Sequence, residues 1–512
     1  MMFKSNIPRI ASFIVICGFY CQAVLCNTAR AAAPVRTEYW ISPTYNPSGG
    51  DGSFANPYDG SIQGGKFDFY MSNLPPDVIV HVLPGTYQTS GSRGFLLKTG
   101  QRVLGSGMDL TVLKLAEGTP SNTGVIGNFW GSNIEVADLT CDANYTSPKA
   151  PTVIYHGIGL AGDHHSIRRV KVKNLAHGNL ANTEAWGIWI YSGRYNNTIG
   201  TNSVGNLIED CVVTGFAGTN CTAIAVYATP TNFISATIRN NVVKNLRARS
   251  TGTSDAINLC NGHHVLVEGN YVEDVTAGVY DDNAGNTNVL VVNNTFRNVA
   301  GGVNVQATVQ RDWYVAGNQI ELEYSGGYVC GIGIDGTHGS AGVGNANLLV
   351  IGNTIKPYSQ AGTKLRAIEA RGFTGLTLVN NSIDPRCDFD LAGSSSVNVY
   401  NNLDLDGKPL VSINQTQPPN SVTRTTVNGS AYSATYADNY IGVAGGEPAS
   451  IVLPAAAGHS GKEFVVANET GNDRPITITS ANSKINGAAL LIINSGYAAR
   501  TLISDGSNWF AR

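Results

Sequence analysis

The sequence has few charged residues and no excess of positive charge. Only 13% of its 512 residues are Asp, Glu, Lys or Arg, and the formal net charge at pH 7 is −3. Binding to a nucleic acid backbone requires a surface rich in Lys and Arg. The sequence offers no such basic field, so we expect no nucleic-acid partner.

The sequence also lacks helical periodicity and metal-binding cysteine spacing. Apart from a short helix expected at residues 66–73, apolar residues alternate in short runs between Gly-rich bends, which predicts strands. The cysteines beyond residue 33 match no metal motif; they are Cys141, Cys211, Cys221, Cys260, Cys330 and Cys387. Their even number permits disulfides in an oxidising compartment, with Cys211 and Cys221 the first pair to test. Buried single thiols are the equal alternative.

Residues 1–33 have the order of a secretory signal peptide. A start with Lys4 and Arg9 precedes an apolar run at 10–26 and a small-residue stretch at 29–33. The alternative is an uncleaved anchor, although the run is near the lower length limit for a spanning helix. We therefore expect a periplasmic or extracellular protein with no membrane association after cleavage.

One short phrase recurs between residues 236 and 402. Each copy has alternating apolar residues, then an Asn, then a further apolar pair. The positions are Asn241, Asn270, Asn294, Asn318, Asn353, Asn381 and Asn402, which lie 29, 24, 24, 35, 28 and 21 residues apart. A recurrent period of this size predicts a solenoid.

Looser copies extend the repeat towards the N-terminus, with Asp138, Val170 and Asp210 where the Asn would stand, and bring the total to about ten coils. A second strand with a Gly-Ile or Gly-Val theme, such as WGIWIYSG, precedes each Asn phrase. Stacked coils would pair these strands in parallel, roughly 4.8 Å apart. An Asn at each inward bend would then bond to the coils above and below it.

These phrases, with HVLPGTY and SGMDLTVLKL near the start, resemble the right-handed parallel β-helix proteins of the pectate-lyase-like superfamily over about residues 78–405. The resemblance implies an all-β chain whose main part is a right-handed parallel β-helix. The superfamily includes polysaccharide lyases, glycoside hydrolases, epimerases, phage tailspikes and adhesins. It therefore implies a fold and no single activity.

The repeated sequence pattern ends after residue 405. We expect an N-terminal cap and first coils at 34–132, the β-helix core at 133–405, a linker at 406–426 and a small C-terminal β-domain at 427–512. The phrases YIGV, IVLPAA and ISDGSNWF resemble C-terminal modules of phage tail fibres. That resemblance implies capping, receptor contact or a homotrimer.

Alternation along the Gly-Ile/Val strands predicts an outward face. One column would contain Gly159, Trp189, Ala225, Asn258, Tyr280, Asn304, Gly333 and Glu369, and a second Ala161, Tyr191, Tyr227, Cys260, Asp282, Gln306, Asp335 and Arg371. Aromatic rings offer platforms for sugars, and polar side chains bond to hydroxyls. We predict a polysaccharide groove with Trp189, Tyr191, Tyr227, Asn258, Asn304, Gln306, Asp335 and Glu369 as substrate-binding residues. Rings that merely shield the sheet are the alternative.

The first catalytic candidates are Asp281 and Asp282. Alternation would turn Asp281 inward, which is costly for a charge, so we expect the strand to end there and both acids to sit on the bend. Paired carboxylates can act as acid and base, or bind Ca²⁺ that grips a uronate. Capping of backbone amides is the alternative.

The second candidate is Asp255 in SDAINL. It resembles the Asp before an apolar strand in pectin-hydrolysing β-helix glycosidases. The chain lacks that family's Asn-Thr-Asp, Gly-His-Gly and Arg-Ile-Lys phrases, so an inverting hydrolase has little support.

The third candidates are two histidine doublets, His164-His165 and His263-His264, which we expect at equivalent bends three coils apart. His263 could act as a general base. A histidine packed at a bend is the alternative.

The last candidates lie late in the repeat and comprise Asp335, His338, Lys364, Glu369 and Arg371. A lyase must neutralise a uronate carboxylate, remove the C5 proton and protonate the leaving oxygen. Tyr280, Arg371 and Lys364 suit these tasks if loops bring them together; a solvated charged turn is the alternative. The sequence thus favours a secreted lyase for uronic-acid polymers, with a glycoside hydrolase or a non-catalytic tailspike-like or adhesin-like glycan binder as alternatives.

Overall fold

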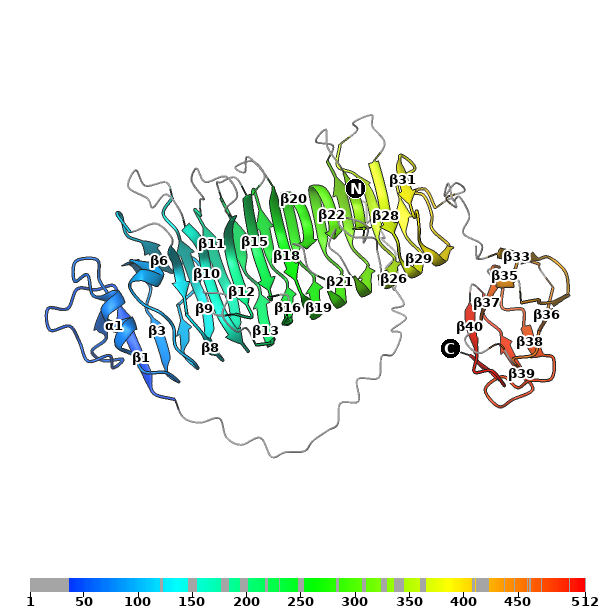
Figure 1. The fold of residues 1–512 in the computed structure, drawn as a ribbon, viewed down its shortest axis with the longest axis horizontal. Helices are drawn as coiled ribbons and strands as arrows, with labels where there is room; N and C mark the ends of the chain where they lie inside the picture. The colour runs from blue at the N-terminus through cyan, green and yellow to red at the C-terminus, as the bar shows by residue number, and fades with distance from the viewer. Residues whose placement is uncertain are drawn as a thin grey trace, which may run out of the picture. The chain divides into compact units, whose positions relative to one another are not determined.

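The computed structural model describes residues 36–119, 123–145, 154–175, 184–193, 201–216, 220–229, 231–246, 253–281, 285–305, 310–323, 329–335, 345–359, 365–407, 410, 423–436, 438–445, 447–457, 459, 462–470, 472–496 and 498–511. The signal-like segment lies outside these residues. The regular elements of the described part are strands, apart from α1 (Phe67–Asn73) and the short 3₁₀ helix η1 (Gly91–Arg93), and Figure 1 shows the strands following one another along the chain. No helix in the described ranges has the length and apolar character needed to cross a membrane.

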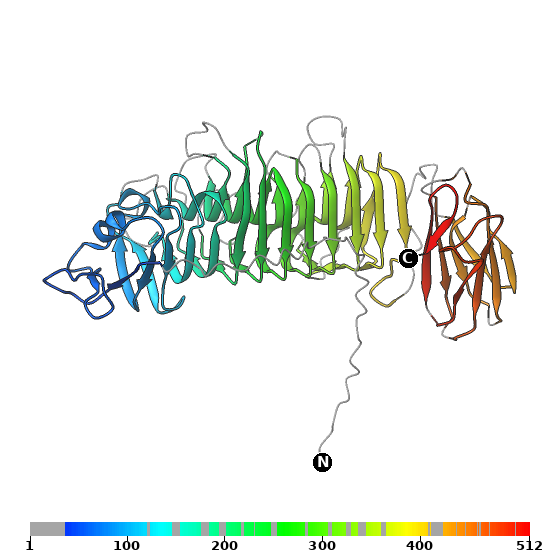
Figure 2. The same cartoon turned by 90° about the horizontal axis from the view of Figure 1, so that it is seen from below.

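Successive coils pair strand on strand in parallel and form the right-handed parallel β-helix that the sequence predicts (Figure 2). Among the described residues its first sheet has ten strands, which matches the predicted number of coils, and its second sheet has thirteen. Each coil contributes to three sheets. The first sheet contains β7 (Thr123–Gly127), β10 (Ile154–Asp163), β12 (Glu184–Tyr191), β15 (Asn220–Tyr227), β18 (Ser254–Cys260), the C-terminal parts of β20 (Tyr271–Asp281) and β22 (Thr295–Val305), β25 (Cys330–Asp335), β28 (Leu365–Arg371) and β31 (Cys387–Asp390).

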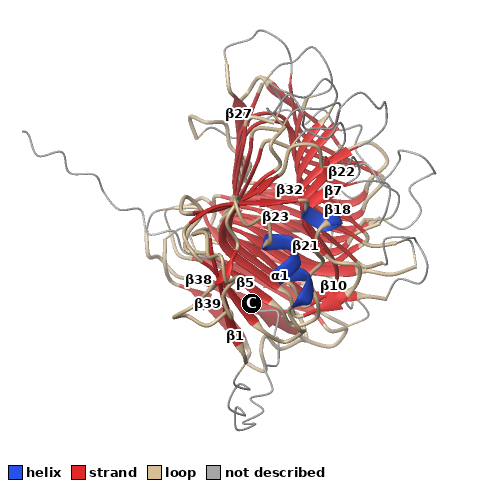
Figure 3. Ribbon diagram, turned by 90° about the vertical axis from the view of Figure 1, so that its left-hand side faces the viewer, coloured by secondary structure: helices blue, strands red, loops and turns tan. Residues whose placement is uncertain are grey.

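The other two sheets continue from coil to coil in the same parallel manner. Figure 3 looks along the stack, so that the strands of successive coils lie behind one another. The second contains β1 (Glu38–Ser42), β3 (Ile79–Val82), β5 (Arg102–Leu104), β9 (Glu135–Asp142), β11 (Ser166–Lys173), β13 (Ser203–Glu209), β16 (Ile234–Arg239), β19 (Gly262–Glu268), β21 (Thr287–Val292), β23 (Arg311–Ala316), β26 (Ala346–Ile351), β29 (Thr374–Val379) and β32 (Ser395–Tyr400). The third contains β4 (Gly85–Thr89), β6 (Thr111–Leu115), the ends of β9 and β11, β14 (Val212–Thr214), β17 (Val242–Lys244), the starts of β20 and β22, β24 (Gln319–Leu322), β27 (Thr354–Pro357) and β30 (Ser382–Ile383). Two short strands, β2 (Tyr58–Asp59) and β8 (Gly131–Ser132), pair with β1 and β10.

A continuous apolar core fills the space between the three sheets. Like residues stack over like; Ile188, Ile224 and Ile257 occupy the same register position in consecutive coils and are fully buried. Burying a side chain of this size contributes about 1.5–3 kcal/mol. Burial of the interior side chains therefore supplies most of the driving force for folding. The residues of the outer faces can differ from coil to coil.

The Asn ladder is confirmed at the bend between the second and third sheets. At each step, the backbone N–H and the side-chain Nδ2 of one Asn both donate to Oδ1 of the Asn in the next coil. From Asn294 to Asn318 the two distances are 2.9 and 3.0 Å. The same pair of bonds joins every neighbouring pair from Asn241 to Asn402. These buried amides satisfy backbone groups that no strand partner reaches.

The earlier coils carry apolar residues at the ladder position. Leu139 pairs with Val170, and the backbone N–H of Cys211 donates to Asn241 Oδ1 at 2.9 Å. The prediction was therefore right for Val170 and one residue early for Asp138 and Asp210. Those two residues have left-handed backbones, with φ of 60° and 55°. Asp tolerates this conformation better than most residues, which explains its place just before the bend.

The six described cysteines are buried as thiols, and none forms a disulfide. The alternative of buried single thiols is therefore confirmed, and Cys211 and Cys221, the first pair to test, form no bridge. Cys211 occupies the ladder position instead, where its Sγ lies 3.3 Å from the carbonyl oxygen of Glu209. Burial raises the pKa of the Cys211 thiol to about 12, so it packs as a neutral group.

Residues beyond the β-helix form strands around a separate hydrophobic core. The strands are β33 (Thr423–Val427), β34 (Ala431–Ser433), β35 (Asp438–Val443), β36 (Ala449–Leu453), β37 (Glu463–Asn468), β38 (Ile476–Ser480), β39 (Leu490–Ile493), β40 (Ala499–Ser504) and β41 (Trp509–Ala511), in one sheet of five and one of four. Trp509 is fully buried, and its indole N–H lies 3.0 Å from both Pro454 O and Ser480 Oγ. This C-terminal module thus has its own two sheets and its own hydrophobic core, as a small β-domain would.

Candidate functional site

The outward face of the first sheet presents three columns of side chains. The central column is the predicted one and contains Gly159, Trp189, Ala225, Asn258, Tyr280, Asn304, Gly333 and Glu369, followed by Asp390. The trailing column, two residues later, contains Ala161, Tyr191, Tyr227 and Cys260 and, further along, Asp335 and Arg371. The register of both columns is as the alternation predicts.

A third column, which sequence reasoning missed, runs three residues before the central one. This leading column contains His156, Trp186, Thr222, Asp255, Ala277, Gly301, Cys330 and Arg366. Alternation fails because two consecutive residues face inward between the leading and central columns. The first of them is always Gly or Ala; a Cβ at Gly278 would lie 2.3 Å from the Phe296 ring. That repeated small residue before each Ile or Val is the signal that could have revealed the column.

Three of the predicted residues, Asp282, Gln306 and Lys364, lie outside the described residues, as does His338. Asp335 is described only through its backbone, which pairs with Arg371. Their proposed roles stay predictions.

The middle of the face brings several predicted residues together. Asn258, Tyr280 and Asn304 follow one another in consecutive coils of the central column. Asp255 begins the same stretch of the leading column, where it is followed by the small residues Ala277 and Gly301. With coils spaced by roughly 4.8 Å, Tyr280 lies between two amides and beside a floor with almost no side chains. Asn258 and Asp255 are only 5% and 6% exposed, and Tyr280 and Asn304 are half-buried.

Asp281 does not belong to this face. β20 ends at Asp281, as predicted, but the side chain is 2% exposed and points to the interior, so the expectation that it sits on the bend is wrong. Gln310 Nε2 donates to Asp281 Oδ2 at 2.8 Å, and Asn286 Nδ2 lies at 3.4 Å. These amide donors make burial of the carboxyl group tolerable. Asp281 therefore cannot be one of a pair of exposed carboxylates that bind Ca²⁺ on this face. The described residues contain no cluster of three or more His, Cys, Asp or Glu side chains suited to a metal.

Arg371 lies in an ion-pair cluster at the far end of the columns. Its guanidinium bonds to Asp390 and lies 3.5 Å from Glu369 Oε1. Arg366 bonds to Glu369 and lies 3.5 Å from Asp390. The hydrogen bond from Arg371 holds the pKa of Asp390 below its usual value. The coils of Tyr280 and Glu369 are three apart, roughly 14 Å, so the expected meeting of Tyr280 with Arg371 does not occur.

The N-terminal end of the columns is aromatic. Trp186 stacks on Trp189 with ring centroids 4.6 Å apart, and Trp189 stacks on Tyr191 at 4.2 Å. Tyr227 follows Tyr191 in the trailing column and is 39% exposed. The structure thus joins the predicted Trp189, Tyr191 and Tyr227, and adds Trp186.

The histidine doublets occupy equivalent bends, as predicted. His164 and His264 both have left-handed backbones, with φ of 54° and 59°, and lie three coils apart in one register position. His263 stacks on Phe233 with centroids 5.0 Å apart at the start of β19, in the second sheet. Burial, then the neighbouring His264, lowers the pKa of His263. The doublets therefore lie away from the face that carries Tyr280.

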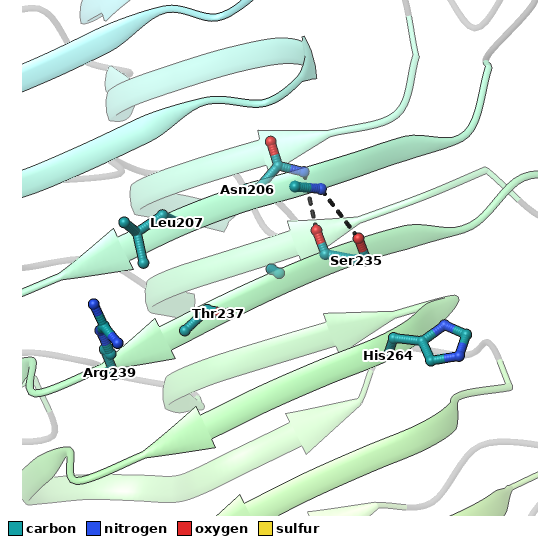
Figure 4. A pocket seen from close by; sticks show the side chains of 8 residues that line it. Asn206, Leu207, Ser235, Thr237, Arg239 and His264 are labelled. Carbon is teal, nitrogen blue, oxygen red and sulfur yellow. Dashed lines mark hydrogen bonds between the residues drawn. The ribbon is translucent and has the colours of Figure 1, made fainter. Parts of the chain in front are cut away.

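A hollow of about 360 Å³ lies on the outward face of the second sheet beside His264 (Figure 4). Asn206 Nδ2 donates to Ser235 O at 3.1 Å across its floor. Arg239 lies on its rim, and the Arg239 Nε donates to Glu209 at 2.7 Å. Because its one guanidinium is already paired, this hollow is a weaker candidate than the first sheet.

No family model matches the sequence, and no curated protein matches it. Solved structures similar to this one include the mannuronan C-5 epimerase AlgE6 A-module of Azotobacter vinelandii, with 19% identity, a TM-score of 0.38, and coverage of 64% of this chain and 90% of the other. A DFA-IIIase mutant from Arthrobacter chlorophenolicus A6 has 15% identity, a TM-score of 0.37, and coverage of 70% and 86%. An exopolygalacturonase from Thermotoga maritima has 10% identity, a TM-score of 0.34, and coverage of 82% and 87%. No residue role is transferred from proteins this distant.

Proposed function

We propose that the protein is a secreted polysaccharide-active β-helix protein that binds an extended glycan along the outward face of the first sheet. We further propose that it cleaves a uronic-acid-containing polymer by β-elimination, with Tyr280 at the reacting centre. The observation that carries this proposal is the order Asn258, Tyr280, Asn304 in consecutive coils of the central column. In this arrangement the Tyr280 oxygen can transfer a proton and the two amides can donate hydrogen bonds to the carboxylate of a charged sugar. The small residues beside them leave room for the sugar.

The chemistry divides among these three side chains. The Asn258 and Asn304 amides would donate hydrogen bonds to the uronate carboxylate, which favours the negative charge that develops when the C5 proton leaves. Tyr280 would act in its phenolate form: its oxygen would take that proton, and the C5–H electron pair would form the C4–C5 double bond as the C4–O bond breaks. The proton would then pass from Tyr280 to the leaving oxygen. These roles replace the one expected for Arg371, whereas the role of Lys364 stays a prediction.

Tyr280→Phe tests the proposal because it removes one oxygen and keeps the ring. With pectate or alginate as substrate, we expect kcat to fall by roughly 10²- to 10⁴-fold while KM changes little. The measurement is the ultraviolet absorbance of the new double bond. Tyr271→Phe is the matched control, since Tyr271 lies on the same strand in the third sheet. Full activity of Tyr280→Phe would remove Tyr280 from the mechanism.

Asp255 supports one alternative. Its carboxyl group lies in the leading column beside this centre, where a glycoside hydrolase would place an acid. New reducing ends without the ultraviolet signal, lost in Asp255→Asn, would favour hydrolysis. Retained glycan binding with neither signal would favour a tailspike-like or adhesin-like binding protein.

A further inference from the structure

His156 is a polar side chain buried without an evident partner. It is 7% exposed, and neither Nδ1 nor Nε2 has a hydrogen-bond partner within the part of the chain that the structure describes. An unpaired buried polar atom costs about 1–3 kcal/mol. His156 has two such atoms in one ring, and packing alone does not explain this unpaired imidazole.

The surrounding backbone is shaped around this imidazole. A Cβ at Gly124 would lie 2.1 Å from the ring, one at Gly159 2.7 Å, and one at Gly127 3.4 Å. Three glycines in two neighbouring coils thus leave the space that the ring fills. The ring lies on the outward side of the first sheet, because Gly124 and Trp186 are its register partners.

The aromatic rings of the next coil lie beside His156. Its ring centroid is 6.1 Å from that of Trp189, which stacks in turn on Trp186 and Tyr191. Trp186 and Trp189 are both half-buried, so each keeps some accessible surface. Stacked indole rings provide an apolar platform of the size of a sugar ring.

The three columns carry no charged side chain among their described residues at this end of the face. The described column residues of β10, β12 and β15 include no Asp, Glu, Lys or Arg. Burial lowers the pKa of His156 to about 4, so near pH 7 the ring is neutral, with one donor and one acceptor nitrogen. A hydroxyl group both donates and accepts, so it can bond to either nitrogen of this neutral ring.

We propose that His156, Trp186 and Trp189 form a subsite for an uncharged sugar residue, which stacks on the indoles and bonds through a hydroxyl to the imidazole. Trp186 and Trp189 lie three coils, or roughly 14 Å, from Tyr280, and His156 lies one coil further away. If the proposed function holds, the substrate is a heteropolysaccharide that carries a neutral sugar a few residues from the uronate that is cleaved.

Tryptophan fluorescence tests the subsite directly. The mature protein is titrated with neutral hexasaccharides of glucose, mannose, galactose and xylose, and with a galacturonate hexamer for comparison. We expect at least one neutral oligosaccharide to bind, and Trp189→Ala to weaken it about tenfold or more. Tyr314→Ala, on the outward face of the second sheet, is the control and should leave the affinity unchanged.

Two variants of His156 separate binding from folding. His156→Phe removes both unpaired nitrogens, so we expect a higher Tm together with an affinity loss of about fivefold to tenfold. His156→Gln keeps a donor and an acceptor and should recover part of the affinity. No binding by any neutral oligosaccharide, or His156→Phe with unchanged affinity, would overturn the subsite.

The result is independent of the outcome at Tyr280. Tyr280→Phe should bind the neutral oligosaccharide as the unmodified protein does, because the two sites are at least three coils apart. Neutral-sugar binding that survives alongside full activity of Tyr280→Phe would refute the proposed reaction and leave the subsite standing. Loss of uronate cleavage in Tyr280→Phe without any neutral-sugar binding would do the reverse.

Discussion

Asn304 and Asn318 are the same residue type in one short stretch of chain, and the fold uses them differently. Asn318 is fully buried at the Asn bend, where it donates to Val291 O at 2.8 Å and takes part in the bonds to Asn294 and Asn353. Asn304 is half-buried on the outward face, between Tyr280 and Gly333. A residue that recurs at its register position in every coil is structural. One whose register neighbours differ is a candidate for function.

The strongest test of this difference is a pair of alanine variants. Asn318→Ala removes several buried hydrogen bonds and leaves the N–H of Asn294 without its acceptor, so we expect a loss of about 3–5 kcal/mol in the free energy of unfolding. Asn304→Ala should cost less than about 1 kcal/mol and lower the activity instead. Urea unfolding and the lyase assay measure the two effects. Similar stability losses in both variants would erase the distinction.

A pH series compares a histidine from the proposed subsite, His156, with a structural histidine, His165. Burial lowers the pKa of both His156 and His165 to about 4 from the usual 6.5. The unfolded chain then binds more protons between these values, so the free energy of unfolding should fall as the pH drops from about 6.5 to about 4, by roughly 3 kcal/mol at most for each residue.

His165 belongs to the structural side, since its Nδ1 accepts from the N–H of Ile134 at 3.4 Å. His156→Phe should weaken the pH dependence of the free energy of unfolding without removing it. Urea unfolding at pH 4 to 7 checks this. A variant with the full original slope would show that His156 does not contribute.

The smallest expected effect concerns the outer side of the third sheet. There Lys244, Glu273, Arg297, Glu321 and Lys356 alternate in charge from coil to coil. Lys356 Nζ lies 3.0 Å from Glu321 Oε1 and Arg297 Nε 3.3 Å from Glu321 Oε2. Partly exposed pairs contribute little, so Glu321→Gln should cost about 0.5 kcal/mol and less at high salt. A loss above about 2 kcal/mol would mean that this face is as structural as the Asn ladder.

The fold was readable because its strongest signal is local and repeated. Each ladder Asn follows a left-handed residue such as Asn293 or Gly317, so the bend appears in the sequence as a short phrase that recurs in coil after coil. The central column was predicted for the same reason, since alternation holds from the inward Ile or Val of each strand onwards.

The site was less readable because its determinants are not local. Asp281 is buried through donors from Asn286 and Gln310, which no pattern around Asp281 announces. The separation of Tyr280 from Arg371 depends on how many coils lie between them. His156 and Trp186 escaped because two inward residues in a row break the alternation, and only Gly or Ala fits at the first of them.

The spacing of the ladder has a consequence for how this chain can vary. Neighbouring ladder residues are separated by as few as 21 and as many as 35 positions, yet their hydrogen bonds stay between 2.8 and 3.0 Å. Each ladder Asn therefore sets the register of its own coil, whatever the length of the coil before it. An insertion in one coil does not shift the register of the next. Segments that border the outward face can lengthen or shorten freely, so new specificity can be acquired in one coil without altering any other.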